Sequence, residues 1–176
     1  EAGTLEEFFL RGDDATEGNI GPALASFTER ALLLDCSPWY RSGRLPAAAG
    51  VRFFFPSPRD GSACKRLAMF LRWMARRDDG VDLGLWGRLS SARLVIPLDT
   101  HLARISMHLG LTARRSPGWL MALDVTARLR ALDPADPVRF DFALCRLGML
   151  SRFPARNQGL SRGCPLCAAP IVAAAS

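Results

Sequence analysis

The basic residues of this chain include a single lysine. Of 23 Lys and Arg residues, only Lys65 is a lysine. Arginine carries the same charge and binds phosphate at least as well, so it can fill most solvated positions. A primary amine, unlike a guanidinium, can attack an electrophilic carbon and form a Schiff base. Lys65 is therefore a candidate nucleophile. The alternative is that one lysine survived compositional drift by chance.

A candidate carboxylate partner for this lysine is Asp99. Ser62 is predicted to cap a helix that carries Lys65 in its first turn, and Asp99 is predicted to cap a later helix. A helix N-terminus carries about half a positive charge, which favours an uncharged amine and an ionised carboxylate nearby. An amine paired with a carboxylate is the equipment of a lysine nucleophile. The alternative is a surface lysine and an ordinary Asp cap.

Hydrophobic residues recur near the helical period of 3.6 along most of the chain, which predicts an all-α fold. The predicted helices are a short one from Thr4, then 22–35, 63–77, Asp99 to Gly110, Ser116 to Leu132 and Asp136 to Leu150. The positioning of Lys65 and Asp99 depends on how these helices pack together.

Two long loops are predicted over Ser37–Gly61 and 80–97. In the first of them, Phe53, Phe54 and Phe55 are predicted to anchor the loop to the core. A wedge that stacks on nucleic-acid bases is the alternative for these three side chains.

An acidic cluster follows the predicted helix that carries Lys65. Asp78, Asp79 and Asp82 lie close in sequence to Arg76 and Arg77. Three carboxylates could form a metal site, but local ion pairs in a solvated turn are the simpler interpretation.

Length and composition fit a folded domain. The chain has 176 residues, of which 49% are hydrophobic and 23% charged, with a net charge of +6. No run approaches the ~20 apolar residues of a membrane span, and five cysteines are too few for a disulfide scaffold. We expect a cytoplasmic protein with a helical domain over residues 1–150 and a basic, cysteine-containing tail over 151–176.

The residues around Asp99 resemble a known signature. The run Ile96–Ile105, which reads IPLDTHLARI, is similar to the V-D-T-H-V-x-R-V motif of the helix-hairpin-helix DNA glycosylases, the superfamily of endonuclease III. In that superfamily the Asp of the motif is catalytic, and in bifunctional members a Lys at the start of an earlier helix attacks C1′ of the damaged nucleotide. The resemblance implies these roles for Asp99 and Lys65. The separation of 34 residues between them (99 − 65) is more similar to that in the archaeal 8-oxoguanine DNA glycosylases.

A wider stretch resembles a narrower and largely uncharacterised bacterial family, a suspected relative of these glycosylases. The segments that carry this resemblance are Ser62–Met74, Asp78–Asp82 and Asp141–Cys145. Members of that family usually have a further helical N-terminal segment, which this chain is expected to lack. The hairpin of the superfamily, L-P-G-V-G-x-K, is replaced here by PRDGSACK over Pro58–Lys65. We therefore expect an unconventional hairpin.

The resemblance implies a helix-hairpin-helix glycosylase fold and a DNA glycosylase and AP lyase of base-excision repair. The expected substrate is an oxidised purine such as 8-oxoguanine, flipped from duplex DNA by a monomer that is associated with the nucleoid and not with a membrane. The candidate substrate- and DNA-binding residues are Gly61, Ser62, Trp73, Trp86, His101 and Arg104. Two alternatives remain: a non-catalytic DNA-binding module on this scaffold, and a monofunctional glycosylase in which Asp99 activates water.

A C-x-x-C pair near the end of the chain is the candidate metal site. Cys164 and Cys167 could ligate zinc or part of an iron–sulfur cluster. Endonuclease III holds a [4Fe–4S] cluster at this end with four cysteines, whereas only Cys145 is available here as a third. We expect that no cofactor is required and that Cys145 packs in the core.

Overall fold

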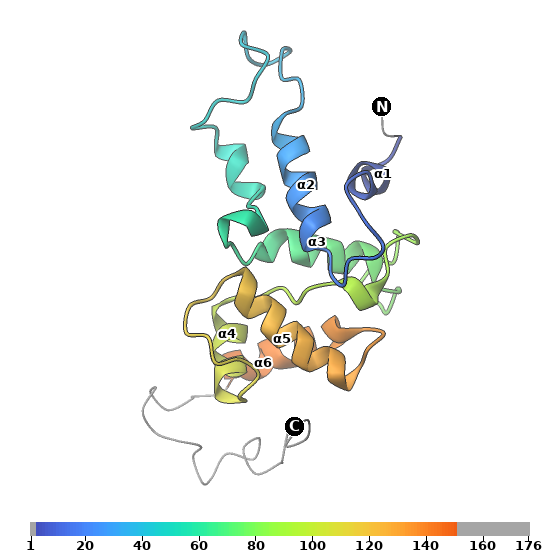
Figure 1. Cartoon of the computed structure of the whole chain (residues 1–176), viewed down its shortest axis with the longest axis vertical. Coiled ribbons are helices and arrows are strands. Elements are labelled where there is room, and N and C mark those ends of the chain that lie inside the picture. Colours follow the sequence, from blue (N-terminus) through green and yellow to red (C-terminus); the bar gives the residue numbers. More distant parts are fainter. Residues whose placement is uncertain (1–2, 151–176) are drawn as a thin grey trace.

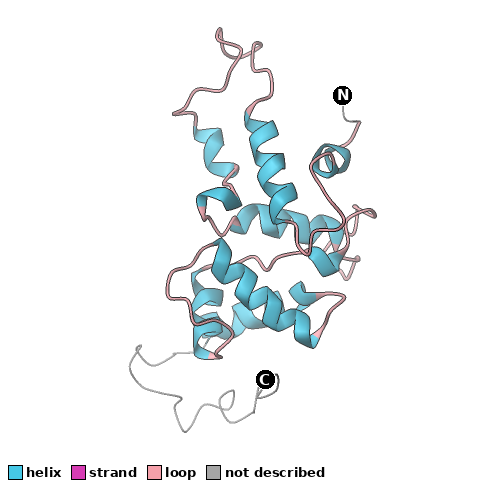
Figure 2. Ribbon diagram, viewed as in Figure 1, coloured by secondary structure: helices cyan, strands magenta, loops and turns pink. Residues whose placement is uncertain are grey.

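The computed structural model describes residues 3–150, and in this part of the chain every regular element is helical (Figure 2). This confirms the all-α prediction for the described residues. The α-helices are α1 (Leu5–Leu10), α2 (Gly21–Leu32), α3 (Lys65–Ala75), α4 (Thr100–His108), α5 (Trp119–Leu132) and α6 (Asp141–Leu150). Short 3-10 helices are η1 (Gly50–Phe54), η2 (Pro58–Asp60), η3 (Ser91–Arg93) and η4 (Pro137–Phe140).

Helix α3 crosses the middle of the molecule (Figure 1). Helices α1 and α2 lie on one side of it, and α4, α5 and α6 lie on the other. One hydrophobic core joins the two sides, because buried residues such as Phe27 of α2, Leu71 of α3 and Ile105 of α4 belong to the same packed cluster. The position of α3 in this core determines where its first residue, Lys65, is held.

Helix α3 is shorter than the predicted helix over 63–77. Its N-cap residue, Cys64, has φ 49°, in the left-handed region, so the helix cannot continue back to residue 63. The Ser62 hydroxyl accepts a hydrogen bond from the Cys64 N–H (3.2 Å) within the turn and does not cap the helix. At the other end, extended backbone at Arg76 stops the helix. The turn at Cys64 therefore sets Lys65 as the first helical residue.

The phenylalanine run in the first long loop differs from its prediction. Only Phe55 packs against the core, with its ring centroid 6.2 Å from that of Phe27. Phe53 and Phe54 remain 64% and 55% exposed. The anchoring prediction was wrong for these two residues because η1 directs successive side chains to different sides.

The acidic cluster after α3 is only partly solvated, which corrects the prediction of a solvated turn. Asp78 and Asp79 are exposed, but Asp82 is 1% exposed. The Leu83 N–H donates to the Trp73 carbonyl (2.7 Å), which folds the chain back along α3 and carries Asp82 inward. Burial requires a charge partner for this carboxylate, and two arginines supply it, one in α3 and one at its C-cap.

Those arginines, Arg72 and Arg76, form a buried ion network. Arg72 is 4% exposed and bonds Asp82 (Nε to Oδ2, 3.2 Å) and Asp141 at the start of α6. Arg76 bonds Asp82 and Asp136, the latter at 2.9 Å (Nε to Oδ2). The network thus links α3 to Asp82 in the segment that follows it, to Asp136 just before η4 and to Asp141 at the start of α6.

The network gives a stability prediction. Replacing Arg72 by Met leaves Asp82 and Asp141 facing each other without the cation between them, and breaking a buried pair in this way costs about 3–5 kcal/mol of unfolding free energy. Urea denaturation of Arg72→Met and of Arg77→Met measures this. Arg77 is an exposed residue two positions beyond the end of α3, so its variant should stay within about 0.5 kcal/mol of wild type. Equal stability of the two variants would contradict the assigned role of Arg72.

Candidate active site

Lys65 and Asp99 lie next to each other. Lys65 begins α3 and Asp99 is the N-cap of α4. The distance from Lys65 Nζ to Asp99 Oδ2 is 3.8 Å, and the two side chains are 46% and 21% exposed. The structure therefore brings together the two residues that the sequence pointed to, at a place that solvent and a substrate can reach.

The two oxygens of the Asp99 carboxylate have different partners: one caps α4 and the other faces Lys65. Oδ1 accepts the Leu102 N–H (2.8 Å) and so caps α4. Oδ2 faces Lys65, and it also accepts a hydrogen bond from the thiol of Cys145 (3.7 Å). Because the cap fixes the orientation of the carboxylate, Oδ2 is held toward the amine.

Cys145 is the site residue that sequence reasoning missed. It is half-buried rather than packed in the core, and it reaches Asp99 from α6. Helices α4 and α6 approach closely at Gly148, where a Cβ would lie only 2.8 Å from the His101 carbonyl oxygen. No local pattern pairs Cys145 with Asp99, but a glycine inside a helical segment is a signal of close packing.

The thiol of Cys145 is held in its protonated form. Burial raises its pKa, and the negative charges of Asp99 and Asp141 raise it further, while Lys65 lowers it. A protonated thiol donates a hydrogen bond and is a weak nucleophile. The arrangement therefore makes Cys145 a hydrogen-bond donor to Asp99 and a poor nucleophile.

Lys65 belongs to a row of cations on α3. Lys65, Arg72 and Arg76 are spaced by seven and four residues, which places them on one face of the helix. Arg72 and Arg76 have multiple carboxylate partners and are largely buried, whereas Lys65 stands at the open end of the row. Asp141 connects the buried arginines with Lys65 electrostatically. Burial raises the pKa of Asp141, whereas Arg72 lowers it. The charge of Asp99 raises the same pKa and that of Lys65 lowers it.

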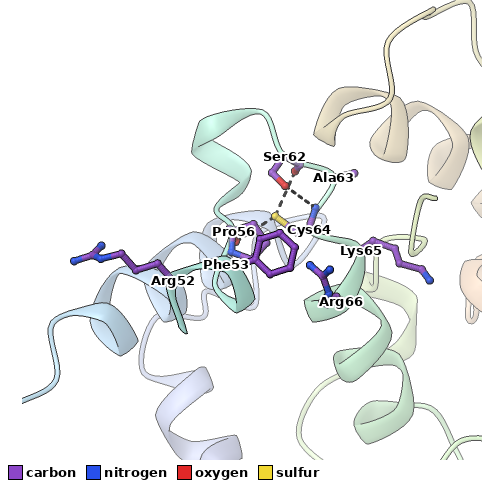
Figure 3. Close-up of a pocket in the computed structure, with 8 residues that line it drawn as sticks. All are labelled: Arg52, Phe53, Pro56, Ser62, Ala63, Cys64, Lys65 and Arg66. Carbon is purple, nitrogen blue, oxygen red and sulfur yellow. Dashed lines mark hydrogen bonds between the residues drawn. The ribbon is translucent and has the colours of Figure 1, made fainter. Parts of the chain in front are cut away.

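A cavity of about 520 Å³ lies at the N-terminus of α3 (Figure 3). This volume is within the range of about 300–1,000 Å³ typical of ligand sites. Its lining residues are Arg52, Phe53, Pro56, Ser62, Ala63, Cys64, Lys65 and Arg66. The Lys65 side chain extends away from Phe53 (Figure 3), so the cavity borders the helix end and does not enclose the Lys65–Asp99 pair.

The thiol of Cys64, on the wall of this cavity, is also unreactive. It contacts the carbonyl oxygens of Pro56 (3.4 Å) and Ser62 (3.3 Å). Burial raises its pKa to about 11, so it is protonated at neutral pH.

The polar groups of the turn before α3 are occupied by hydrogen bonds within the turn and to α5. The Gly61 N–H donates to the Pro58 carbonyl (3.0 Å), and the Gly61 carbonyl accepts the Trp119 N–H (3.0 Å). The Ser62 hydroxyl is engaged by Cys64, as described above. The Gly61 amide is therefore already occupied and not available to bind a phosphate.

The remaining candidate residues are dispersed. His101 is half-buried and Arg104 is exposed, both on α4 close to Asp99. Trp73 is 40% exposed but lies eight residues beyond Lys65, about 12 Å along α3. Trp86 is only 7% exposed, and its ring lies 5.7 Å from that of Phe9 and 5.5 Å from that of Phe70. Trp86 is thus a core residue with no open face for a base, which corrects its assignment to a binding site.

Within residues 3–150, no cluster of three or more His, Cys, Asp or Glu side chains is arranged to hold a metal ion. Cys164 and Cys167 lie outside the described residues. In the same described part of the chain, no helix has the length and apolar character needed to span a membrane.

Comparison with known proteins identifies one family. The family described as "Protein of unknown function (DUF2400)" matches residues 1–150, and the chain belongs to it. No curated protein and no solved structure matches the chain.

The electrostatics of Cys145 can be tested by alkylation. We expect slow reaction of Cys145 with iodoacetamide at pH 8, because its raised pKa keeps the thiolate scarce. Asp99→Asn should accelerate the reaction, since it removes a negative charge that raises this pKa. Peptide mapping by mass spectrometry separates Cys145 from the other cysteines, and Cys36 is the internal control. An unchanged rate at Cys145 in Asp99→Asn would contradict the contact.

Proposed function

We propose that this protein is a DNA glycosylase with AP lyase activity, of the helix-hairpin-helix type, and that Lys65 is its nucleophile. The observation that carries the proposal is the 3.8 Å separation of Lys65 Nζ and Asp99 Oδ2 at the starts of two helices. The resemblance of the segment around Asp99 to the glycosylase signature and the presence of only one lysine in the chain support it.

The proposed reaction assigns a role to each group of the site. Asp99 accepts a proton from the Lys65 ammonium, and the free amine then attacks C1′ of the damaged nucleotide. The bond from C1′ to the base breaks, and the base leaves with the electron pair and takes up the proton that Asp99 holds. The Asp99 carboxylate restored in this way stabilises the positive charge that develops on the sugar. The Lys65 adduct opens to a Schiff base, from which loss of a C2′ proton expels the 3′ phosphate by β-elimination.

Cys145 acts in this scheme as a positioning residue. Its thiol bonds Asp99 Oδ2, the same oxygen that faces the amine. The preferred substrate is an oxidised purine such as 8-oxoguanine in duplex DNA, by analogy with the superfamily. The proposal also entails a monomer that acts on the bacterial nucleoid in the cytoplasm and needs no cofactor.

Borohydride trapping tests the proposal. Wild-type protein is incubated with duplex oligonucleotides that carry different lesions, and covalent complexes are counted on denaturing gels. We expect a complex with one lesion and none with Lys65→Arg. The matched control is the double variant Lys65→Arg/Arg66→Lys, which keeps composition and charge but moves the amine by one helical position; it should also fail to trap. Asp99→Asn should slow base release by about 10²–10⁴-fold.

The outcomes separate the alternatives. Base release without a trapped complex would assign catalysis to water activated by Asp99 and contradict the lysine mechanism. Duplex binding with neither release nor trapping for any lesion would favour a non-catalytic DNA-binding module. Trapping by the Lys65→Arg/Arg66→Lys variant would contradict the dependence on the geometry at residue 65.

A further inference from the structure

Large aromatic side chains are exposed together in one segment. Trp39, Tyr40, Phe53 and Phe54 are 77%, 36%, 64% and 55% exposed. All four lie in residues 33–54, here called the arm, which follows α2 and includes η1. The arm projects away from α4, α5 and α6 (Figure 1). Such a concentration of exposed aromatic surface is typical of an interaction site.

Part of this surface is a preformed stack. The guanidinium carbon of Arg66 lies 4.1 Å from the centroid of the Phe53 ring and 5.9 Å from that of Phe54. The two rings pack edge to face, with centroids 5.8 Å apart at 77°. Phe53 keeps most of its surface open despite these contacts. A planar, electron-rich group such as a nucleobase can stack on it at little cost in side-chain ordering.

The charge around the stack is positive. The basic residues between 33 and 66 are Arg41, Arg44, Arg52, Arg59, Lys65 and Arg66, against Asp35 and Asp60. Arg59 is paired with Glu29 (3.1 Å), and Asp35 accepts hydrogen bonds from Ser37 in its own turn. The surface beside the aromatics is therefore complementary to a polyanion.

The stack also adjoins the α3 cavity. Arg52 and Phe53 of the arm line the same cavity of about 520 Å³ as Lys65 and Arg66 (Figure 3). Aromatic rings beside an arginine, next to a cavity lined by further cations, match the base and phosphate of a single strand. In a regular duplex the base faces are covered by stacked neighbours, so they reach exposed rings only where a base step is unstacked.

We propose that the arm and Arg66 bind an unpaired stretch of DNA, with bases stacked on Phe53 and Phe54 and phosphates bound by Arg66. Arg52 adds its positive charge nearby, while its guanidinium donates to the Pro46 (2.9 Å) and Leu45 (3.1 Å) carbonyls of the arm. The binding itself does not require chemistry at Lys65. The consequence that a strand on this surface is delivered to Lys65 rests on the proposed function.

Binding of a fluorescein-labelled dT20 strand to the full chain, followed by anisotropy, tests this inference. We expect Phe53→Ala and Phe54→Ala each to weaken binding by about tenfold and the double variant by more. Phe53→Trp should restore binding, because it keeps a stacking face. The matched control is Phe142→Ala, since Phe142 is 58% exposed on α6 and has the Arg146 guanidinium carbon 5.9 Å from its ring centroid. This control should bind dT20 as wild type does.

Several outcomes would overturn the inference. One is equal binding of dT20 by wild type and the Phe53→Ala/Phe54→Ala variant. Another is tighter binding of rU20 than of dT20, or a loss of blunt-duplex binding in the Phe53→Ala/Phe54→Ala variant that equals its loss of dT20 binding. A third is loss of vesicle binding (phosphatidylcholine with phosphatidylglycerol) or of self-association in the double variant, with dT20 binding unchanged; sedimentation and gel filtration measure these.

The failures of the two proposals are distinguishable. If only the glycosylase proposal fails, dT20 binding and its dependence on Phe53 and Phe54 persist while borohydride traps nothing. If only the strand-binding inference fails, duplex trapping through Lys65 persists while the phenylalanine substitutions leave dT20 binding unchanged.

Discussion

The guanidinium of Arg72 is buried between two carboxylates that come from different parts of the chain, Asp82 and Asp141. Asp82 Oδ1 is buried without a hydrogen-bond partner among the described residues, so Asp82 relies on the bonds that its other oxygen makes with Arg72 and Arg76. Separating any of these groups would leave a charge unpaired in a medium of low dielectric. The elements that carry them are therefore held in one arrangement.

That arrangement determines the geometry of the candidate active site. Arg72 fixes α3 against α6, and the first residue of α3 is Lys65. The same contact holds α6, which brings Cys145 to Asp99. Asp99 is in turn fixed by its cap on α4. Three helices thus converge on one carboxylate oxygen, and the amine is the group at that point that remains open to a substrate.

On the cationic face of α3, the buried residues and the exposed residue have different roles. The buried positions carry arginines, whose planar guanidinium can satisfy several carboxylates at once. The open position carries the lysine, whose amine can become a nucleophile. The N-terminus of α3, where Lys65 lies, also borders the cavity and the aromatic arm, so the surfaces proposed to bind DNA and to act on it meet at this end of the helix.

Local sequence signals predicted some of this geometry but not all of it. The cap at Asp99 was predictable, because a cap is a contact between residues three positions apart. The start of α3 was not, since a cysteine in the left-handed region at residue 64 breaks the usual preference for Gly or Asn. The burial of Asp82 and the contact of Cys145 with Asp99 depend on packing between distant segments, which helical periodicity does not encode. The prediction that Phe53 and Phe54 pack against the core was wrong because apolar residues are buried only on average.

The central claim is that the amine of Lys65 is the nucleophile, and locating the covalent bond tests it most directly. The full chain is incubated with a duplex that contains one abasic site, the product is reduced with borohydride and digested, and mass spectrometry identifies the modified peptide. Because the chain has one lysine, only Lys65 and the N-terminal amine can carry the adduct. The account predicts the adduct on Lys65. An adduct confined to the N-terminal amine, or none at all, would contradict it.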